Sequence, residues 1–104
     1  MKQSTNIIIP AIELNDELLK CLKELNNINY SNFFVSIVLD QKPKKKIPKF
    51  KYKLNNLIVG KINMSKKRNI AARKFKSEYI AFLDSDAYPN KNWLKLAIKY
   101  LKQK

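Results

Sequence analysis

The segment EYIAFLDSD, residues 78–86, places two acids directly after a run of apolar residues. The apolar run predicts a buried strand that ends at Asp84. Asp84 and Asp86 stand two positions apart, so both carboxylates can point to one side of the chain. Carboxylates about 4 Å apart repel each other by roughly 4 kcal/mol at an effective dielectric of 20, so the pair favours a bound cation. A turn capped by Asp86, or acids neutralised by Lys91 or Arg73, is the alternative.

Strand-like and helix-like segments alternate along the rest of the chain. Short apolar runs predict strands at residues 6–9, 33–39, 57–59 and 79–83. Asn15 suits the N-cap of a helix that ends near residue 25, and Ser65 suits the N-cap of a helix that ends near residue 75. The inner face of this second helix is expected to hold Ile70, Ala71 and Phe75. A last helix is expected to bury Trp93, Leu94, Ala97, Ile98 and Leu101.

This alternation predicts an α/β fold in which helices flank a mostly parallel sheet. In such sheets, ligands collect at the carboxyl ends of the strands. Pro10, Asp40 and Asp84 all fall at that edge, in a chain that contains only eight acids. A ligand site is therefore expected where these three strands end. With 104 residues the chain is long enough for one small domain.

The composition limits the chemistry that the chain can perform. It has no histidine, and its single cysteine, Cys21, cannot form an internal disulfide. A thiolate–imidazole pair is therefore excluded, and a metal site must be built from oxygens, which points to magnesium, manganese or calcium. The net charge of +14 comes from 22 basic residues, of which 20 are lysines. It reflects either compositional drift or a surface that attracts phosphates, nucleic acids or anionic lipids.

Seven lysines and two prolines gather in residues 42–53, which predicts a surface loop or a weak edge strand. Its last five residues alternate lysine with the rings of Phe50 and Tyr52. We expect the rings to pack inward while the lysines face water. Contact with an anionic membrane, where each lysine is worth about 1 kcal/mol, is one alternative. Stacking of single-stranded nucleic acid on the rings is the other.

Four elements of the chain resemble family 2 glycosyltransferases, which have the GT-A fold. Residues 78–86 are similar to that family's GEYIAFLDxD signature, with Ser77 in place of the glycine. Residues 65–69, SKKRN, resemble its SxARN element, and eight residues separate the two elements, as in the family. Residues 7–10, IIIP, and residues 34–40 are similar to its first two strands, which end in proline and aspartate. The resemblance covers nearly the whole chain.

The resemblance implies a site for a nucleotide-sugar donor and a divalent metal, manganese or magnesium. Asp84 and Asp86 would hold the metal and the ribose-diphosphate, and Asp40 would contact the base, typically a uracil. Arg68 and Asn69 would help to line the donor pocket. Judged from the residues alone, Arg68 also fits a solvated helix charge, Asn69 a packing or capping residue, and Asp40 a capping acid.

The resemblance further implies that Pro10 shapes the loop under the nucleotide. The family usually continues this proline with Thr-Tyr-Asn, whereas this chain has Ala11-Ile12-Glu13, and Gln41 stands where a second acid commonly follows Asp40. Both departures bear on which nucleotide is bound. In the family, the acceptor-binding part and the catalytic base follow the D-x-D strand. Residues 1–104 are therefore expected to be the donor-binding N-terminal part of an incomplete domain, with unknown catalytic residues and little turnover of its own.

The expected activity is metal-assisted, inverting transfer of a sugar, with UDP as the expected carrier, to a hydroxyl of a saccharide or lipid-linked acceptor, as in cell-surface polysaccharide synthesis. A nucleotidyltransferase is one rival, but it normally has a Gly-rich basic loop where this chain has residues 10–13, PAIE. A basic nucleic-acid-binding domain is the other, although nucleic acid is not the expected partner. Residues 1–3, MKQ, lead into no signal-peptide core, so we expect a cytoplasmic protein, with peripheral membrane contact as an option.

Overall fold

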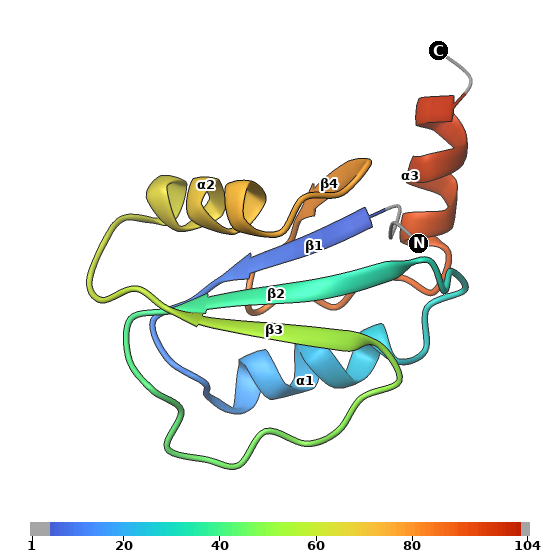
Figure 1. Ribbon diagram of the computed structural model, residues 1–104. Coiled ribbons are helices and arrows are strands. Elements are labelled where there is room, and N and C mark those ends of the chain that lie inside the picture. The colour runs from blue at the N-terminus through green and yellow to red at the C-terminus, as the bar shows by residue number, and fades with distance from the viewer. Residues whose placement is uncertain (1–4, 103–104) are drawn as a thin grey trace.

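A parallel sheet of four strands, in the order β3-β2-β1-β4, forms the centre of the computed structural model, which describes residues 5–102 (Figure 1). Every pair of neighbouring strands runs in the same direction, which confirms the predicted sheet. In chain order the elements are β1 (Thr5–Pro10), α1 (Asp16–Leu25), β2 (Phe33–Leu39), β3 (Lys53–Ile58), α2 (Met64–Lys74), β4 (Tyr79–Phe82) and α3 (Trp93–Lys102).

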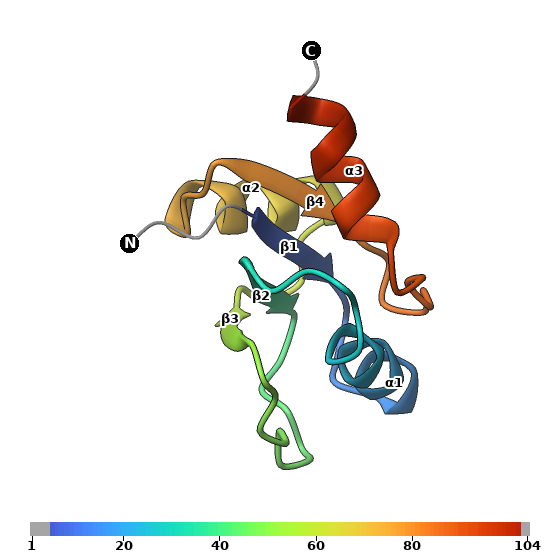
Figure 2. The ribbon, with the colours of Figure 1, turned by 90° about the vertical axis from the view of Figure 1, so that its right-hand side faces the viewer.

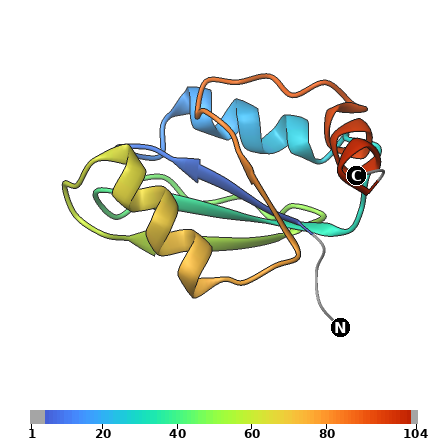
Figure 3. The same cartoon turned by 90° about the horizontal axis from the view of Figure 1, so that it is seen from above.

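The central strands β1 and β2 are buried along their whole length, because helices cover both faces of the sheet. Ile7 and Ile9 point to the face that α1 and α3 cover, and Ile8 points to the face that α2 covers. Figure 3 shows α1 and α2 on opposite sides of the strands. A side-chain period of two thus splits one apolar run between two cores, the larger of which lies under α1.

Helix α1 begins and ends where the sequence predicts. The side chain of Asn15 accepts a hydrogen bond of 2.9 Å from the backbone N–H of Leu18, as an N-cap residue does. Asp16 and Glu17 occupy the first turn, where acids interact favourably with the helix dipole. The buried residues recur every three or four positions, at Leu18, Cys21, Leu22 and Leu25.

The predictions for β3 and α2 need correction. Strand β3 starts at Lys53 and ends at Ile58, whereas the apolar run alone predicted residues 57–59. It is an edge strand, so Lys53 can face water while its backbone pairs with β2. Helix α2 is capped by Asn63 instead of Ser65, because the Asn63 side chain accepts from the N–H of Lys66. On its inner face Ala71 is fully buried, but Ile70 is 37% exposed.

Strand β4 is far less buried than its sequence predicts. It ends at Phe82 and, within the described sheet, bonds only to β1, so that Ile80 and Phe82 remain 46% and 52% exposed. Helix α3 likewise buries only part of the predicted face, at Leu94 and Ile98, whereas Leu101 is 46% exposed. Figure 2 shows α3 reaching beyond the sheet at the side where β4 lies. An apolar surface is therefore left open along β4 and α3.

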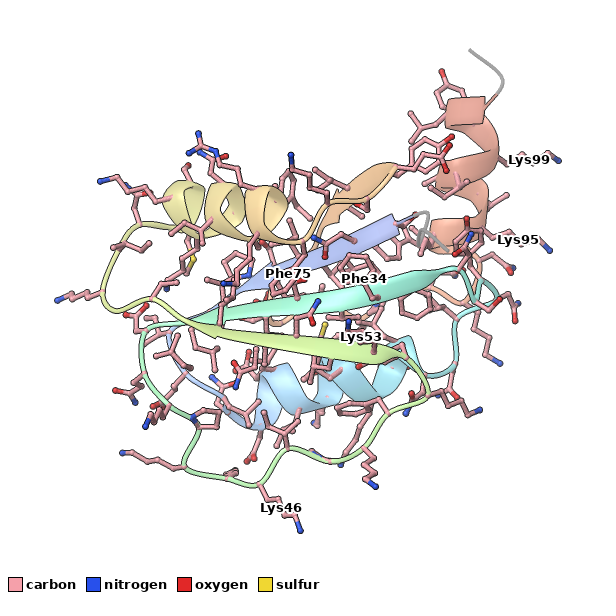
Figure 4. The ribbon with its side chains drawn as sticks, in the orientation of Figure 1. Phe34, Lys46, Lys53, Phe75, Lys95 and Lys99 are labelled. Atoms are coloured by element: carbon pink, nitrogen blue, oxygen red, sulfur yellow. The ribbon has the colours of Figure 1, made fainter. Side chains whose placement is uncertain are left out.

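A polar contact is buried between the sheet and α2. The side-chain oxygen of Asn6 accepts a hydrogen bond of 2.8 Å from the Ser36 hydroxyl, and its amide donates to the Phe75 carbonyl at 3.0 Å. Asn6 and Ser36 are fully buried. Asn6 thus joins β1 and β2 to the end of α2, and Figure 4 shows Phe75 between this helix and the sheet.

Replacing Asn6 with alanine is expected to lower the free energy of unfolding by about 2 kcal/mol, because two buried polar groups lose their partner. Urea unfolding followed by circular dichroism measures the loss. Asn27→Ala is the control, since Asn27 is exposed, and its change should stay within about 0.5 kcal/mol. Equal stabilities of the two variants would show that the Asn6 hydrogen bonds contribute nothing.

Candidate functional site at the carboxyl edge of the sheet

Backbone hydrogen bonds join the three loops that leave the carboxyl ends of β1, β2 and β4. The N–H of Ala11 donates to Val38 O at 2.9 Å, and the N–H of Asp40 donates to Ile12 O at 3.0 Å. On the other side of β1, the N–H of Leu83 donates to Ile8 O at 3.1 Å. Pro10 is buried as the last residue of β1, opposite Val38. The sheet therefore brings Pro10, Asp40 and the residues after Leu83 to one edge, as predicted.

Asp40 is held in place by a lysine of α2 that the sequence did not single out. The Lys67 ammonium forms an ion pair with Oδ1 of Asp40 and donates a hydrogen bond of 2.9 Å to the Ala11 carbonyl. The Lys67 side chain is 1% exposed and that of Asp40 is 17% exposed. One buried cation thus ties α2 to the loops that follow β1 and β2. Asp40 is not the capping acid that the sequence also allowed.

Lys67 was missed because one lysine among 20 carries little information. Its position in the motif could have drawn attention to it. Residues 65–69 resemble the SxARN element, and this element has alanine where the chain has Lys67. A lysine at the inner face of a helix must find an anion or carbonyl oxygens, since burial of an unpaired ammonium is costly. Asp40 and Ala11 supply both partners.

Two residues that differ from the usual family pattern, one after Pro10 and one after Asp40, also contact each other. Glu13 and Gln41 stand where the family usually has asparagine and a second acid, and the Gln41 side-chain amide donates to Glu13 Oε2 at 2.9 Å. A carboxylate at position 41 would face that of Glu13 and repel it. The glutamine therefore fits the glutamate, and the pair borders a cavity of about 240 Å³ whose other lining residues include Lys42, Lys44 and Lys45.

Asp84 and Asp86 lie in a turn that follows β4. The N–H of Ala87 donates to Asp84 O at 3.0 Å, so residues 84–87 form a β-turn and the alternation of a strand does not apply to the two acids. Both side chains are exposed, that of Asp84 at 76%. Within residues 5–102, neither Lys91 nor Arg73 forms an ion pair with them. The turn therefore leaves both carboxylates accessible to a ligand.

Arg68 faces this turn from α2. The Arg68 guanidinium lies 5.6 Å from the centre of the Phe82 ring and its Nη2 is 3.9 Å from Asp84 Oδ1. The guanidinium therefore has two partners at the turn, the Phe82 ring and Asp84, unlike a helix charge that is only solvated. Asn69 is exposed on the same helix, and no hydrogen bond in the described part of the chain links it to the acids.

The acids fit a hard divalent cation only in part. Among the described residues, no group of three or more His, Cys, Asp or Glu side chains converges to hold a metal ion. Asp84 and Asp86 can supply at most two carboxylate ligands. Magnesium is commonly bound by one or two carboxylates, with waters and substrate phosphates completing its shell. Asp84 and Asp86 thus suit a metal that is shared with a phosphate ligand.

Cys21 lies behind the turn and is chemically protected. Its thiol is fully buried on α1 and points to Asp84 O at 3.9 Å. Burial, with a smaller effect of the Asp86 charge, raises the pKa of Cys21 from 9.0 to about 12. The unfolded chain therefore ionises before the folded protein does, so this group stabilises the fold fully below pH 9 and the contribution is lost as the pH rises towards 12.

Cys21 is accordingly expected to react with a disulfide reagent such as dithionitrobenzoate at pH 8 much more slowly in the folded protein than in 6 M urea, because only the thiolate attacks. The absorbance of the released thiolate measures the rate. A rate at least a hundredfold slower in the folded protein is expected from a rise of this size in the pKa of Cys21. Equal rates in buffer and urea would show that the thiol is accessible.

A cavity of about 560 Å³ lies at the opposite, amino edge of the sheet. It is lined by Leu25, Asn26, Ile28, Asn29, Tyr30, Ser31, Phe33, Lys51, Tyr52 and Lys95. None of the predicted site residues borders it. The candidate site at the carboxyl edge is therefore separate from this cavity.

The parallel α/β sheet brings two acids and an arginine to its carboxyl edge, which is where ligands bind in open α/β sheets. The sequence model of "Glycosyl transferase family 2" matches residues 6–104, and the chain belongs to this family. No curated protein matches the sequence. Within residues 5–102, no helix has both the length and the apolar character needed to cross a bilayer.

Solved structures with the same fold include TarS from S. aureus. The crystal structure of TarS 1-349 matches with a TM-score of 0.76 and 24% identity, over 96% of this chain and 32% of that one. TarS 1-349 in complex with UDP-GlcNAc gives a TM-score of 0.77 and 24% identity, over 96% of this chain and 31% of that one. The complex of TarS 1-349 with UDP gives a TM-score of 0.76 and 24% identity, over 96% of this chain and 32% of that one. This chain thus has the GT-A fold and spans about a third of TarS 1-349.

Proposed function

We propose that this chain binds the donor of a glycosyltransferase reaction, in which a sugar passes from a nucleotide-sugar, with UDP as the carrier, to an acceptor hydroxyl with inversion. The observation that carries the proposal is the convergence of Asp40, Arg68 and Asp84 at one edge of the sheet in a chain of this family. TarS, which shares the fold, has been crystallised with UDP-GlcNAc and with UDP. The acceptor and the base that deprotonates it stay unassigned.

Each residue at the edge has a distinct task in this proposal. Asp40 accepts a hydrogen bond from the base, and Pro10 ends β1 so that the following loop lies under the nucleotide. Arg68 approaches the diphosphate with a guanidinium that is already stacked on Phe82. Asp84 and Asp86 would hold manganese or magnesium, which would supply Lewis-acid stabilisation of negative charge on the diphosphate. Asn69, which is exposed on α2 next to Arg68, would help to line the donor pocket.

Titration of the 104-residue chain with UDP, with and without manganese, tests the proposal. UDP is expected to bind at least tenfold more tightly when manganese is present, since the metal offsets the repulsion between carboxylates and phosphates. Binding should persist at about 150 mM salt, where contacts between exposed charges are largely screened. UDP binding that ignores the metal, or no UDP binding at all, would contradict the proposal.

The two rival functions predict other results. A nucleotidyltransferase would prefer a nucleoside triphosphate, whereas residues 10–13 offer neither glycine nor lysine for one. A nucleic-acid-binding domain would bind DNA or RNA with a steep dependence on salt, and this binding would survive Asp84→Ala. The rings of Phe50 and Tyr52 stack on each other with their centres 5.2 Å apart and pack against the core, so base stacking on them is disfavoured.

We also propose that the protein works in the cytoplasm and contacts the inner face of an anionic membrane through its lysine loop, residues 42–53. The loop runs along the outside of the sheet and α1, and Figure 4 shows Lys46 pointing away from the protein. Lipid-linked acceptors would then be close to the donor site. Vesicles with and without anionic lipid test the contact: equal sedimentation with both would exclude it.

A further inference from the structure

The ion pair between Lys67 and Asp40 leaves the two carboxylate oxygens in different surroundings. Oδ1 is buried and has the Lys67 ammonium as its partner. The Asp40 side chain is nevertheless 17% exposed, and because Oδ1 is buried, the exposed area belongs to its other atoms. Oδ2 is therefore the oxygen that Asp40 can offer to a ligand at the carboxyl edge.

Lys67 itself cannot take part in direct recognition. Its ammonium is buried, since the side chain is 1% exposed, and it is already committed to Asp40 and the Ala11 carbonyl. An ammonium carries three donors and no acceptor. Whatever atom of residue 40 faces Lys67 must consequently be an acceptor, and Lys67 fixes the orientation of that side chain.

We propose that Lys67 is a positioning residue for Asp40: it holds Oδ1, so that Oδ2 faces the pyrimidine base and accepts a hydrogen bond from it. The inference rests on the proposed donor site. Uracil presents an N3–H donor, which Oδ2 of Asp40 can accept, whereas cytosine presents an unprotonated N3 that the carboxylate repels. The two bases have the same size, so the difference at N3 decides which of them Asp40 binds more tightly.

Asp40→Asn provides a direct test, because an asparagine at this position has only one allowed orientation. Lys67 requires its Oδ1, so its amide NH₂ must face the base. A donor then meets the N3–H of uracil and disfavours it, but meets the N3 acceptor of cytosine and binds it. The single substitution should therefore reverse the preference. If Lys67 is also replaced by methionine, the amide is free to turn and the preference should disappear.

Binding of UDP and CDP to the 104-residue chain, measured by calorimetry at one fixed manganese concentration, gives the readout. The wild type should bind UDP about tenfold more tightly than CDP, the usual worth of one well-placed hydrogen bond. Asp40→Asn should bind CDP more tightly than UDP. The double variant Asp40→Asn/Lys67→Met should bind both within about threefold. Lys66→Met, which changes an exposed lysine one position away, should keep the wild-type ratio.

The outcomes separate this inference from the proposed function. A wild type that binds neither nucleotide overturns both. A wild type that prefers UDP, with an Asp40→Asn variant that keeps this preference, overturns the role of Lys67 alone. Circular dichroism checks that each variant is folded. Should Asp40→Asn fail to fold, Lys67→Met decides, with Lys66→Met as its control. A UDP affinity about tenfold lower than that of the control supports the positioning role, and an unchanged UDP affinity overturns it.

Discussion

Asp84→Asn is expected to weaken manganese-dependent UDP binding by about a hundredfold, since loss of even an outer partner of a metal ligand typically costs 10- to 100-fold in metal affinity. The substitution keeps the size of the side chain and removes its charge. Without metal, the same variant should bind UDP as well as the wild type or better, because one carboxylate no longer repels the diphosphate. Calorimetry with manganese and with a chelator measures both values.

Glu78→Gln is the matched control for this prediction. Glu78 is an exposed acid that precedes β4, at the end of the strand remote from the turn. Both substitutions raise the net charge of +14 by one, so a general attraction of phosphate by the lysines changes equally in the two variants. Equal effects of Asp84→Asn and Glu78→Gln would show that UDP responds to the overall charge and not to a metal at the turn.

Lys67→Met is expected to lower the free energy of unfolding by about 3 kcal/mol. Removing one partner of a buried ion pair costs about 3–5 kcal/mol because the other charge stays uncompensated. The lower end applies here, since Asp40 keeps some contact with water. The hydrogen bond to Ala11 is lost as well. Urea unfolding measures the change, and Lys66→Met, on the exposed side of α2, should stay within about 0.5 kcal/mol.

A double-mutant cycle with Asp40→Asn separates the charge from the packing of the lysine stem. The double variant Asp40→Asn/Lys67→Met should be more stable than Lys67→Met alone, because no buried carboxylate is left without a cation. If the two single effects simply add, the ion pair does not contribute to stability. The position of α2 would then be fixed by the packing of Ala71 and its neighbours in the smaller core.

The central part of the fold was predictable because the local sequence and the tertiary environment favour the same secondary structure there. Strands β1 and β2 lie between helices, so the apolar side chains of residues 7–9 and 37–39 suit burial on both faces of the sheet. Helix α1 carries its own start signal in Asn15 and an apolar face with a clear period. For these elements the local pattern and the tertiary environment give the same answer.

The edges of the sheet were harder to predict, because the burial of an edge strand depends on its neighbours. The apolar run of residues 79–83 predicted a fully buried strand, yet Ile80 is 46% exposed because β4 has only β1 beside it among the described residues. Conversely, Lys53 starts β3 although its side chain is polar, since an edge strand pairs through its backbone. Neither outcome is visible in side-chain pattern alone.

The site was predictable in its position but not in its contacts. The order of the strands brings Asp40 and Asp84 to one edge, and this follows from parallel topology. The pairing of Asp40 with Lys67 depends on how α2 sits over the loops, which no spacing reveals. The turn at Asp84 replaced an expected strand geometry because β4 stops at Phe82.

The two halves of the candidate site are attached to strands that differ in their support within the described sheet. Pro10 ends β1 and Asp40 follows β2, the two central strands, whereas Asp84 and Asp86 follow β4, a strand of four residues that bonds to one neighbour within the described sheet. Elements with few buried contacts open at low free energy, so immobilising the turn subtracts from the affinity for a donor. A contact that stabilises β4 on its open side would therefore raise the affinity for a donor without touching it. Strand β4 would then couple the site to whatever binds at that side.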